Sequence, residues 1–161
     1  MLIIALKNVM NRYTIPLAFL LLMSLHAEIF AQSVENEIMK PIHLLFEGME
    51  NADTAIIKRA FTKNVMMKVV SEKGVKIETV ENFLKQIASK KVNTSKWIEK
   101  LYNTEIRVNG NLAQVWTEYS FYVGETFNHC GVDSFALIKL DGTWKIVYIM
   151  DTRRKEGCEE Y

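Results

Sequence analysis

The sequence predicts an α+β fold, a cone-shaped roll in which three N-terminal helices pack on a strongly curved antiparallel sheet. Three observations predict it: apolar residues recur at helical spacing in the first half, they alternate with polar residues in the second, and turn signals separate the alternating runs. Helices followed by strands favour α+β over alternating α/β. At 161 residues, without a long linker rich in Pro, Gly or Ser, one domain with one core is expected.

Apolar residues at helical spacing predict three helices before residue 90. Those of the first are Val34, Ile38, Ile42, Leu45 and Met49, those of the second Ile56, Ile57, Ala60 and Phe61, and those of the third Val80, Phe83, Leu84 and Ile87. Pro41 must kink the first helix or begin its second part. Asp53 and Thr79 suit the N-caps of the other two helices. A short strand pair, VMMKVV and GVKIE around SEKG, is expected between those two helices.

Four consecutive antiparallel strands are predicted from Tyr102 onward. Their sequences are TEIRV, LAQVWTEYSFYV, FNHCGVDSFALIKL and TWKIVYIMD, with turns at NGN, GET and DG between them. The two middle strands are long enough to favour a strongly curved sheet, and Gly131 offers a bend or bulge. A curved sheet wrapped around helices encloses a pocket.

The first 31 residues are expected to be a signal peptide. Lys7 and Arg12 precede a charge-free apolar stretch, Ile15–Leu25, and small Ala31 offers a cleavage point. A membrane anchor is the weaker interpretation, because a spanning helix needs about 18 or more apolar residues. We therefore expect a single domain over 32–161 that is exported, periplasmic or secreted, with no membrane contact after cleavage.

The charge of the mature chain excludes one class of partner. The whole chain has 20 basic and 19 acidic residues, and cleavage removes Lys7, Arg12 and Glu28, which leaves the two signs equal. Nucleic acids and anionic membranes need a concentrated basic surface. No nucleic-acid partner is expected.

The two cysteines are expected to form a disulfide, Cys130 to Cys158, because exported cysteines pair more often than they stay free. A zinc site would need further ligands at suitable spacing, and only His129 is adjacent. The sequence has no GxSxG, P-loop, HExxH or Gly-rich nucleotide motif. Neither a metal nor a cofactor is expected.

The second half also carries a family resemblance. The segments NGNLAQVWTEYSFY, HCGVDSFALIK and DGTWKI follow the predicted helices in that order, and the chain resembles the nuclear transport factor 2-like superfamily over about residues 36–155. More narrowly it resembles the SnoaL-like and putative lumazine-binding bacterial members. The superfamily includes steroid isomerases, polyketide cyclases, dehydratases, ligand binders and assembly domains, so the resemblance implies a pocket and no particular reaction.

Hairpin loop lengths decide which side chains share a face. A three-residue loop, Gly124–Thr126, places Phe135 opposite Val115 and gives one consistently apolar face, whereas a two-residue loop mixes apolar and polar residues. A two-residue DG turn places Tyr148 and Met150 on that same face. The ligand-binding face is therefore predicted to carry Thr117, Tyr119, Phe121, His129, Asp133, Phe135, Tyr148 and Met150.

Asp133 is the first catalytic candidate, because burial among apolar neighbours would raise its pKa toward the range of a general base at neutral pH. The resemblance supports this role, since isomerases of the superfamily use a cavity aspartate in this way. Tyr119 is a candidate hydroxyl donor. The alternative is a structural Asp133, hydrogen-bonded to Thr117, Tyr119 or Tyr148.

His129 is a weaker candidate. It lies four residues from Asp133, about 13 Å along an extended strand, so the two are not expected to form a dyad. We expect it near the pocket mouth, opposite Phe121 and Arg154, where a partly exposed histidine bonded to a loop is the more frequent case.

The opposite sheet face is too apolar for plain solvent. It is predicted to carry Trp116, Ser120, Tyr122, Cys130, Val132 and Ile138. Either a homodimer forms through this face, or the C-terminal tail, drawn back by the disulfide, covers it.

Three functions follow in order. The first is an exported protein that binds a small, largely apolar organic molecule, because no complete catalytic set is visible. The second is an isomerase, dehydratase or cyclase with Asp133 as general base and Tyr119 or Tyr148 stabilising an enolate. The third is a dimerisation or assembly domain that acts through the outer sheet face.

Overall fold

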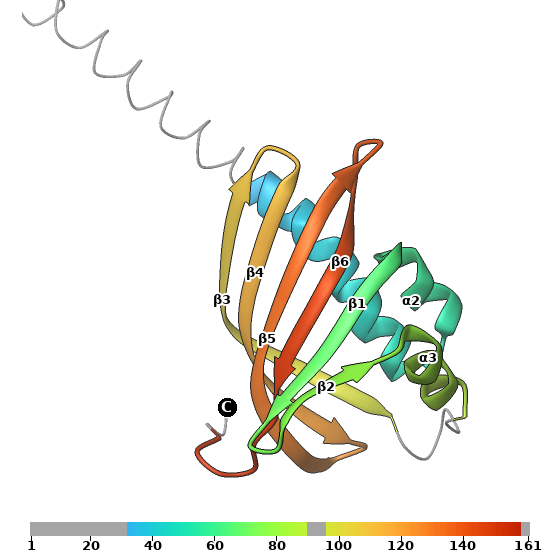
Figure 1. Cartoon of the computed structure of the whole chain (residues 1–161), viewed down its shortest axis with the longest axis vertical. Helices are drawn as coiled ribbons and strands as arrows, with labels where there is room; N and C mark the ends of the chain where they lie inside the picture. Colours follow the sequence, from blue (N-terminus) through green and yellow to red (C-terminus); the bar gives the residue numbers. More distant parts are fainter. Residues whose placement is uncertain (1–31, 90–95, 159–161) are drawn as a thin grey trace, which may run out of the picture. The chain divides into compact units, whose positions relative to one another are not determined.

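The computed structural model of the chain describes residues 32–89 and 96–158 (Figure 1). The predicted signal peptide, residues 1–31, lies outside them, and the predicted domain bounds stay a prediction. The chain divides into two units, Met1–Glu37 and Ile38–Tyr161, and the fold below is that of the second. Within the described ranges, no helix is both long and apolar enough to cross a membrane.

Three helices form where apolar spacing predicts them. Residues 32–50 are helical, and helices α2 (Thr54–Ala60) and α3 (Val80–Ala88) follow. The Asp53 carboxylate accepts hydrogen bonds from the first turn of α2, at 2.8 Å from the Ala55 nitrogen. The Thr79 hydroxyl caps α3 by accepting from the Asn82 nitrogen at 3.2 Å. Both predicted caps are therefore confirmed.

Six strands form one curved open sheet, and the predicted α+β class is confirmed. The strands are β1 (Phe61–Ser71), β2 (Gly74–Glu78), β3 (Trp97–Asn109), β4 (Leu112–Val123), β5 (Thr126–Leu140) and β6 (Thr143–Thr152). Their order across the sheet is β2-β1-β6-β5-β4-β3. All neighbours are antiparallel except β1 and β6, which run parallel. Two boundaries differ from the prediction: Phe61 begins β1 instead of ending α2, and β3 begins five residues before Tyr102.

The β4–β5 pairing has the predicted register, but a two-residue loop and a β-bulge produce it in place of the predicted three-residue loop. Val115 faces Phe135 as expected. The loop has two residues, since Val123 pairs with Thr126, and one extra residue, Asn128, interrupts the ladder. This β-bulge restores the apolar face that the three-residue loop would have given.

The β5–β6 pairing corrects the prediction for Tyr148 and Met150. The DG turn has two residues as expected, and Leu137 faces Ile146. An extra residue, Val147, then shifts the register, so that Ile149 and not Tyr148 faces Phe135. A single inserted residue reverses the facing of all later side chains. Tyr148 and Met150 therefore lie on the outer face, and Ile149 and Asp151 take the predicted inner positions.

The core lies between the helices and the inner face of the sheet. Its largest fully buried apolar side chains are Ile38, Ile42, Ile57, Ile87, Val115, Phe135, Leu137 and Ile146. The ring of Phe46, on the first helix, meets that of Phe135 edge-on at 6.2 Å. Each large apolar side chain buried in this way contributes about 1.5–3 kcal/mol, so this layer fixes the helices on the sheet.

The predicted disulfide is present. Cys130 and Cys158 are joined, and the Cα atoms lie 5.8 Å apart. Backbone hydrogen bonds also join Cys130 and Arg154 in both directions, at 3.0 and 2.9 Å. Ser120 and Cys130 are both buried on the outer face, whereas Trp116 is 50% exposed. The tail is thus held against the end of this face that carries Cys130. Covering of the whole face by the tail and a homodimer through the face both stay predictions.

Gly131 allows a close approach of β5 to the end of β6. The Tyr119 hydroxyl donates to the Thr152 carbonyl oxygen at 2.8 Å. A Cβ at Gly131 would lie 1.8 Å from that same oxygen and 3.0 Å from the Tyr119 ring. We expect Gly131→Ala to lower the free energy of unfolding by at least about 2 kcal/mol, because backbone must move to admit the methyl group.

Chemical denaturation measures this effect. The matched control is Ser134→Ala on the same strand, which should change stability by less than about 0.5 kcal/mol. Equal stabilities of the two variants would contradict the close approach.

Candidate functional site

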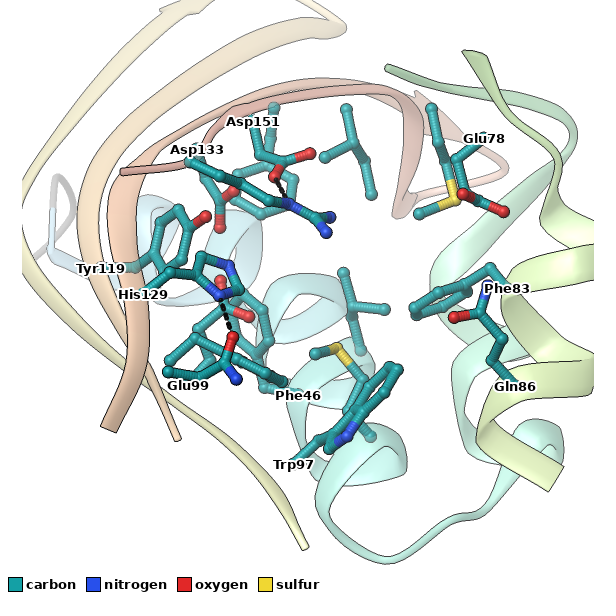
Figure 2. Close-up of a pocket in the computed structure, with 18 of the residues that line it drawn as sticks. Phe46, Glu78, Phe83, Gln86, Trp97, Glu99, Tyr119, His129, Asp133 and Asp151 are labelled. Carbon is teal, nitrogen blue, oxygen red and sulfur yellow. Dashed lines mark hydrogen bonds and ion pairs between the residues drawn. The ribbon is translucent and has the colours of Figure 1, made fainter. Parts of the chain in front are cut away.

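A cavity of about 320 Å³ opens between the helices and the inner sheet face (Figure 2). Its apolar lining is Leu45, Phe46, Met49, Met67, Phe83, Trp97, Phe121, Val123, Phe135 and Ile149. Its polar lining is Glu78, Gln86, Glu99, Tyr119, Asn128, His129, Asp133, Asp151 and Arg153. In Figure 2, Asp133, Asp151 and Tyr119 lie on the sheet side, while Phe83 and Gln86 of α3 lie across the cavity. The cavity therefore has a largely apolar, aromatic-rich lining with most of its polar groups, including Glu99, Tyr119, Asp133 and Asp151, on the sheet side.

The polar wall is centred on two hydrogen-bonded carboxyl groups, Glu99 of β3 and Asp133 of β5. Asp133 is only 4% exposed. Desolvation by burial raises the pKa of Glu99 to about 7, the hydrogen bond to Asp133 opposes this shift, and the Asp151 charge adds to it. Burial, followed by the Glu99 charge, raises the pKa of Asp133 well above its usual value. At neutral pH this pair therefore holds at least one proton.

This arrangement changes the predicted role of Asp133. The pKa of its carboxyl is raised, as predicted, but its partner is Glu99 and not Thr117, Tyr119 or Tyr148. The raised pKa favours the protonated form of Asp133, which donates a hydrogen bond and cannot accept a proton as a general base does. Glu99, with a pKa near neutrality, is the group that exchanges a proton easily.

Asp151 and Arg153 form an ion pair beside the carboxyl pair. The Arg153 Nε atom donates to an Asp151 carboxylate oxygen at 2.6 Å. The Asp151 side chain is 14% exposed and that of Arg153 is 51% exposed. The ion pair neutralises Asp151, and the guanidinium charge lowers the pKa of both Glu99 and Asp133.

His129 lies opposite Phe121 on β4 as predicted, whereas Arg154, predicted on its other side, pairs with Cys130 instead. Its ring lies 4.9 Å from that of Phe121, and its Nδ1 atom lies 2.8 Å from the Asn128 side-chain oxygen. Burial, and then the charges of Arg153 and Lys155, lower its pKa to about 4. The imidazole is therefore neutral at pH 7. Because Nδ1 donates to Asn128, Nε2 is left as a hydrogen-bond acceptor.

The hydroxyl groups of Tyr119 and Thr117 make hydrogen bonds within the fold. The Tyr119 hydroxyl donates to the Thr152 carbonyl, and burial raises its pKa above the usual value. Thr117 faces Asp133 in the ladder, but its hydroxyl lies 2.8 Å from that of Thr104 and 3.0 Å from the Tyr102 carbonyl oxygen. Thr117 is absent from the cavity lining. Of the predicted site residues, the cavity thus brings together Tyr119, Phe121, His129, Asp133 and Phe135.

The sequence prediction missed Glu99 and Arg153. Glu99 lies in the first third of β3, ahead of the segment predicted as a strand. In the sequence, Glu99 lies two residues from both Trp97 and Leu101, a spacing that places all three on one face of a strand. The pairing of these neighbours with Val123 and Tyr119 shows that this face points into the cavity. Arg153 lies beyond the last predicted strand, yet it lines the cavity because the chain around Arg154 is paired with Cys130.

Comparison with known proteins assigns the chain to a family. The model of the family described as putative lumazine-binding matches residues 33–150. The chain belongs to this putative lumazine-binding family. The match supports the resemblance to the nuclear transport factor 2-like superfamily. No protein of curated function matches the sequence significantly.

Solved structures share the fold of this family member. A nuclear transport factor 2-like protein of unknown function from Shewanella baltica is 16% identical, with a TM-score of 0.60, and the match covers 77% of this chain and 96% of that chain. A superfamily protein from Salmonella enterica serovar Typhimurium is 19% identical, with a TM-score of 0.60 and coverage of 81% and 99%. A protein of unknown function with a cystatin-like fold from Nostoc punctiforme is 11% identical, with a TM-score of 0.61 and coverage of 76% and 92%. At these identities the likeness shows the fold alone.

Proposed function

We propose that the protein is exported and binds a small organic molecule in this cavity. The observation that carries the proposal is a cavity of about 320 Å³ whose lining is largely apolar and aromatic-rich, with most of its polar groups on the sheet side. Ligand pockets have volumes of about 300–1,000 Å³ and combine apolar linings with a few convergent polar groups. The description of the family as putative lumazine-binding also supports a small ligand.

The polar wall refines the kind of ligand that the sequence suggested. A wholly apolar molecule would displace water from the carboxyl groups of Glu99 and Asp133 and from the Arg153 guanidinium without replacing its hydrogen bonds, which is costly. A ligand with an apolar body and a polar end avoids this cost. The aromatic side chains Phe46, Phe83 and Trp97 would contact the body of such a ligand.

Capture from a cell extract, followed by native mass spectrometry, tests the proposal. The wild-type protein is expected to retain a small molecule, whereas Gln86→Trp, on the cavity wall of α3, is expected to lose it by blocking the cavity. The matched control is Gln114→Trp on β4, outside this cavity, which should retain the molecule. Capture by Gln86→Trp equal to that of the wild type would place the ligand elsewhere and reject the proposal.

Proton transfer to or from a bound carbonyl compound is the second candidate function. It is favoured by the pKa of about 7 at Glu99, which is suited to proton exchange at neutral pH. Glu99 would accept the proton and protonated Asp133 would donate a hydrogen bond to the developing oxyanion. Tyr119 is not suited to this role, because its hydroxyl bonds to Thr152, and Tyr148 lies on the outer face.

Deuterium incorporation distinguishes the two functions. A captured ligand incubated in D₂O with a small amount of protein should gain carbon-bound deuterium if the protein is an enzyme, and Glu99→Gln should abolish the gain while binding persists. If the ligand gains no deuterium with the wild-type protein, proton transfer is rejected and ligand binding without reaction is the function that stands.

A further inference from the structure

Within the described residues the carboxyl pair in the cavity has no ion-pair partner, although the nearby Arg153 charge acts on both groups. Among residues 32–89 and 96–158, ion pairs join Lys76 to Glu78, Lys85 to Glu81, Lys96 to Glu50 and Arg153 to Asp151, and none of them includes Glu99 or Asp133. Yet Asp133 is more than nine-tenths buried, and both side chains line the cavity. A buried carboxyl group without an ion-pair partner is neutralised by keeping its proton, so the Glu99–Asp133 pair can become fully ionised only beside a positive group that faces it directly.

The other charges around the cavity are already balanced. Asp151 pairs with Arg153 at 2.6 Å, and Glu78 pairs with Lys76 at 3.0 Å. His129 is neutral at pH 7, because its pKa is lowered to about 4. The remaining charge on the sheet wall is therefore that of the Glu99–Asp133 pair.

The aromatic side chains around the cavity suit a positively charged group with an apolar body. The rings of Trp97 and Phe121 meet edge-on at 5.5 Å, and Phe46 and Phe83 line the cavity from the helices. Aromatic faces attract organic cations, and desolvation strengthens this attraction. An anionic ligand would instead meet the Glu99, Asp133 and Asp151 carboxyl groups.

We infer that the cavity takes a small organic cation, with its charged end against the Glu99–Asp133 pair and its apolar body among the aromatic rings. This inference rests on the proposed binding function and names the ligand class. Binding releases a proton from the pair, because the cation favours its ionised form. The groups that face Glu99 in this equilibrium are Asp133 on β5, Tyr119 on β4, and Asp151 and Arg153 at the end of β6.

Calorimetric titration of the purified protein with three probes tests the ligand class. Benzyltrimethylammonium carries a permanent charge that does not titrate, benzyl alcohol is its neutral counterpart, and phenylacetate is the anion. At pH 8 the cation is expected to bind at least about tenfold more tightly than benzyl alcohol. Its affinity should rise about tenfold between pH 5.5 and pH 8, because Glu99 loses its proton in this range.

Two variants assign the effect to the carboxyl pair. Glu99→Gln keeps the shape of the side chain and should abolish both the preference for the cation and the pH dependence. Glu105→Gln, an exposed position on the same strand, should keep both. Retention of the preference in Glu99→Gln would overturn the inference.

The outcomes also separate this inference from the proposed function. Tighter binding of phenylacetate or benzyl alcohol than of the cation overturns the ligand class and leaves small-molecule binding in place. Failure of all three probes overturns the ligand class as well, and if extract capture also fails, the binding function falls with it.

Discussion

Glu99→Gln is expected to stabilise the ligand-free protein at pH 8 by up to about 3 kcal/mol. The pKa of Glu99 is raised from 4.5 to about 7 in the fold. Between these two pH values the folded protein holds a proton that the unfolded chain has lost. The free energy of unfolding that depends on this proton is fully present below pH 4.5 and is lost as the pH rises through 7. Glutamine does not ionise and therefore avoids the loss. Denaturant unfolding at pH 5 and pH 8 measures the effect.

The same experiment separates the contribution of His129. Its pKa is lowered from 6.5 to about 4, so its contribution to stability is present above pH 6.5 and is lost as the pH falls through 4. His129 and Glu99 therefore act in opposite directions between about pH 4.5 and 6.5, and the fall above pH 6.5 belongs to the carboxyl pair. Glu105→Gln, on the same strand, should follow the wild type at every pH. Equal pH dependence in wild type and Glu99→Gln would contradict the buried carboxyl pair.

Reduction of the disulfide is expected to lower the free energy of unfolding by about 2–4 kcal/mol. The bond closes a segment with a sequence separation of 28 between Cys130 and Cys158, and its loss increases the entropy of the unfolded chain. It also frees the segment after β6 that carries Arg153. Because the guanidinium lowers the pKa of Glu99, reduction should raise that pKa further.

Unfolding with and without dithiothreitol measures the first effect, and thiol counting confirms that the bond is reduced. Cys158→Ala is the second test, since it removes the bond without a reductant. Unchanged stability after complete reduction would show that the disulfide does not hold the tail against β5.

The sequence predicted the fold class because each signal was local and repeated. Asp53 and Thr79 cap helices where apolar spacing begins, and the alternation through Val115 and Phe135 set the facing of β4 and β5. The disulfide followed from two cysteines in a chain expected to be exported. None of these predictions needed a long-range contact other than strand pairing.

The cavity was predicted less well, for two physical reasons. The extra residue at Val147 lies in a run where Val147 and Tyr148 are both apolar, so alternation could not reveal the shift that turned Tyr148 outward and Asp151 inward. Glu99 has charged Lys100 beside it, and a charged pair is normally solvent-exposed. Only the pairing of β3 with β4 shows that Glu99 faces Phe121 and reaches the cavity.

NMR titration of ¹³C-labelled side-chain carboxyl groups measures whether Glu99 and Asp133 form a proton-holding pair on the cavity wall. Assigned through Glu99→Gln and Asp133→Asn, the Glu99 signal is expected to titrate near pH 7, with Asp133 also far above its usual range. If both carboxyl groups titrate near pH 4, the range of exposed side chains, Glu99 and Asp133 do not form a buried pair.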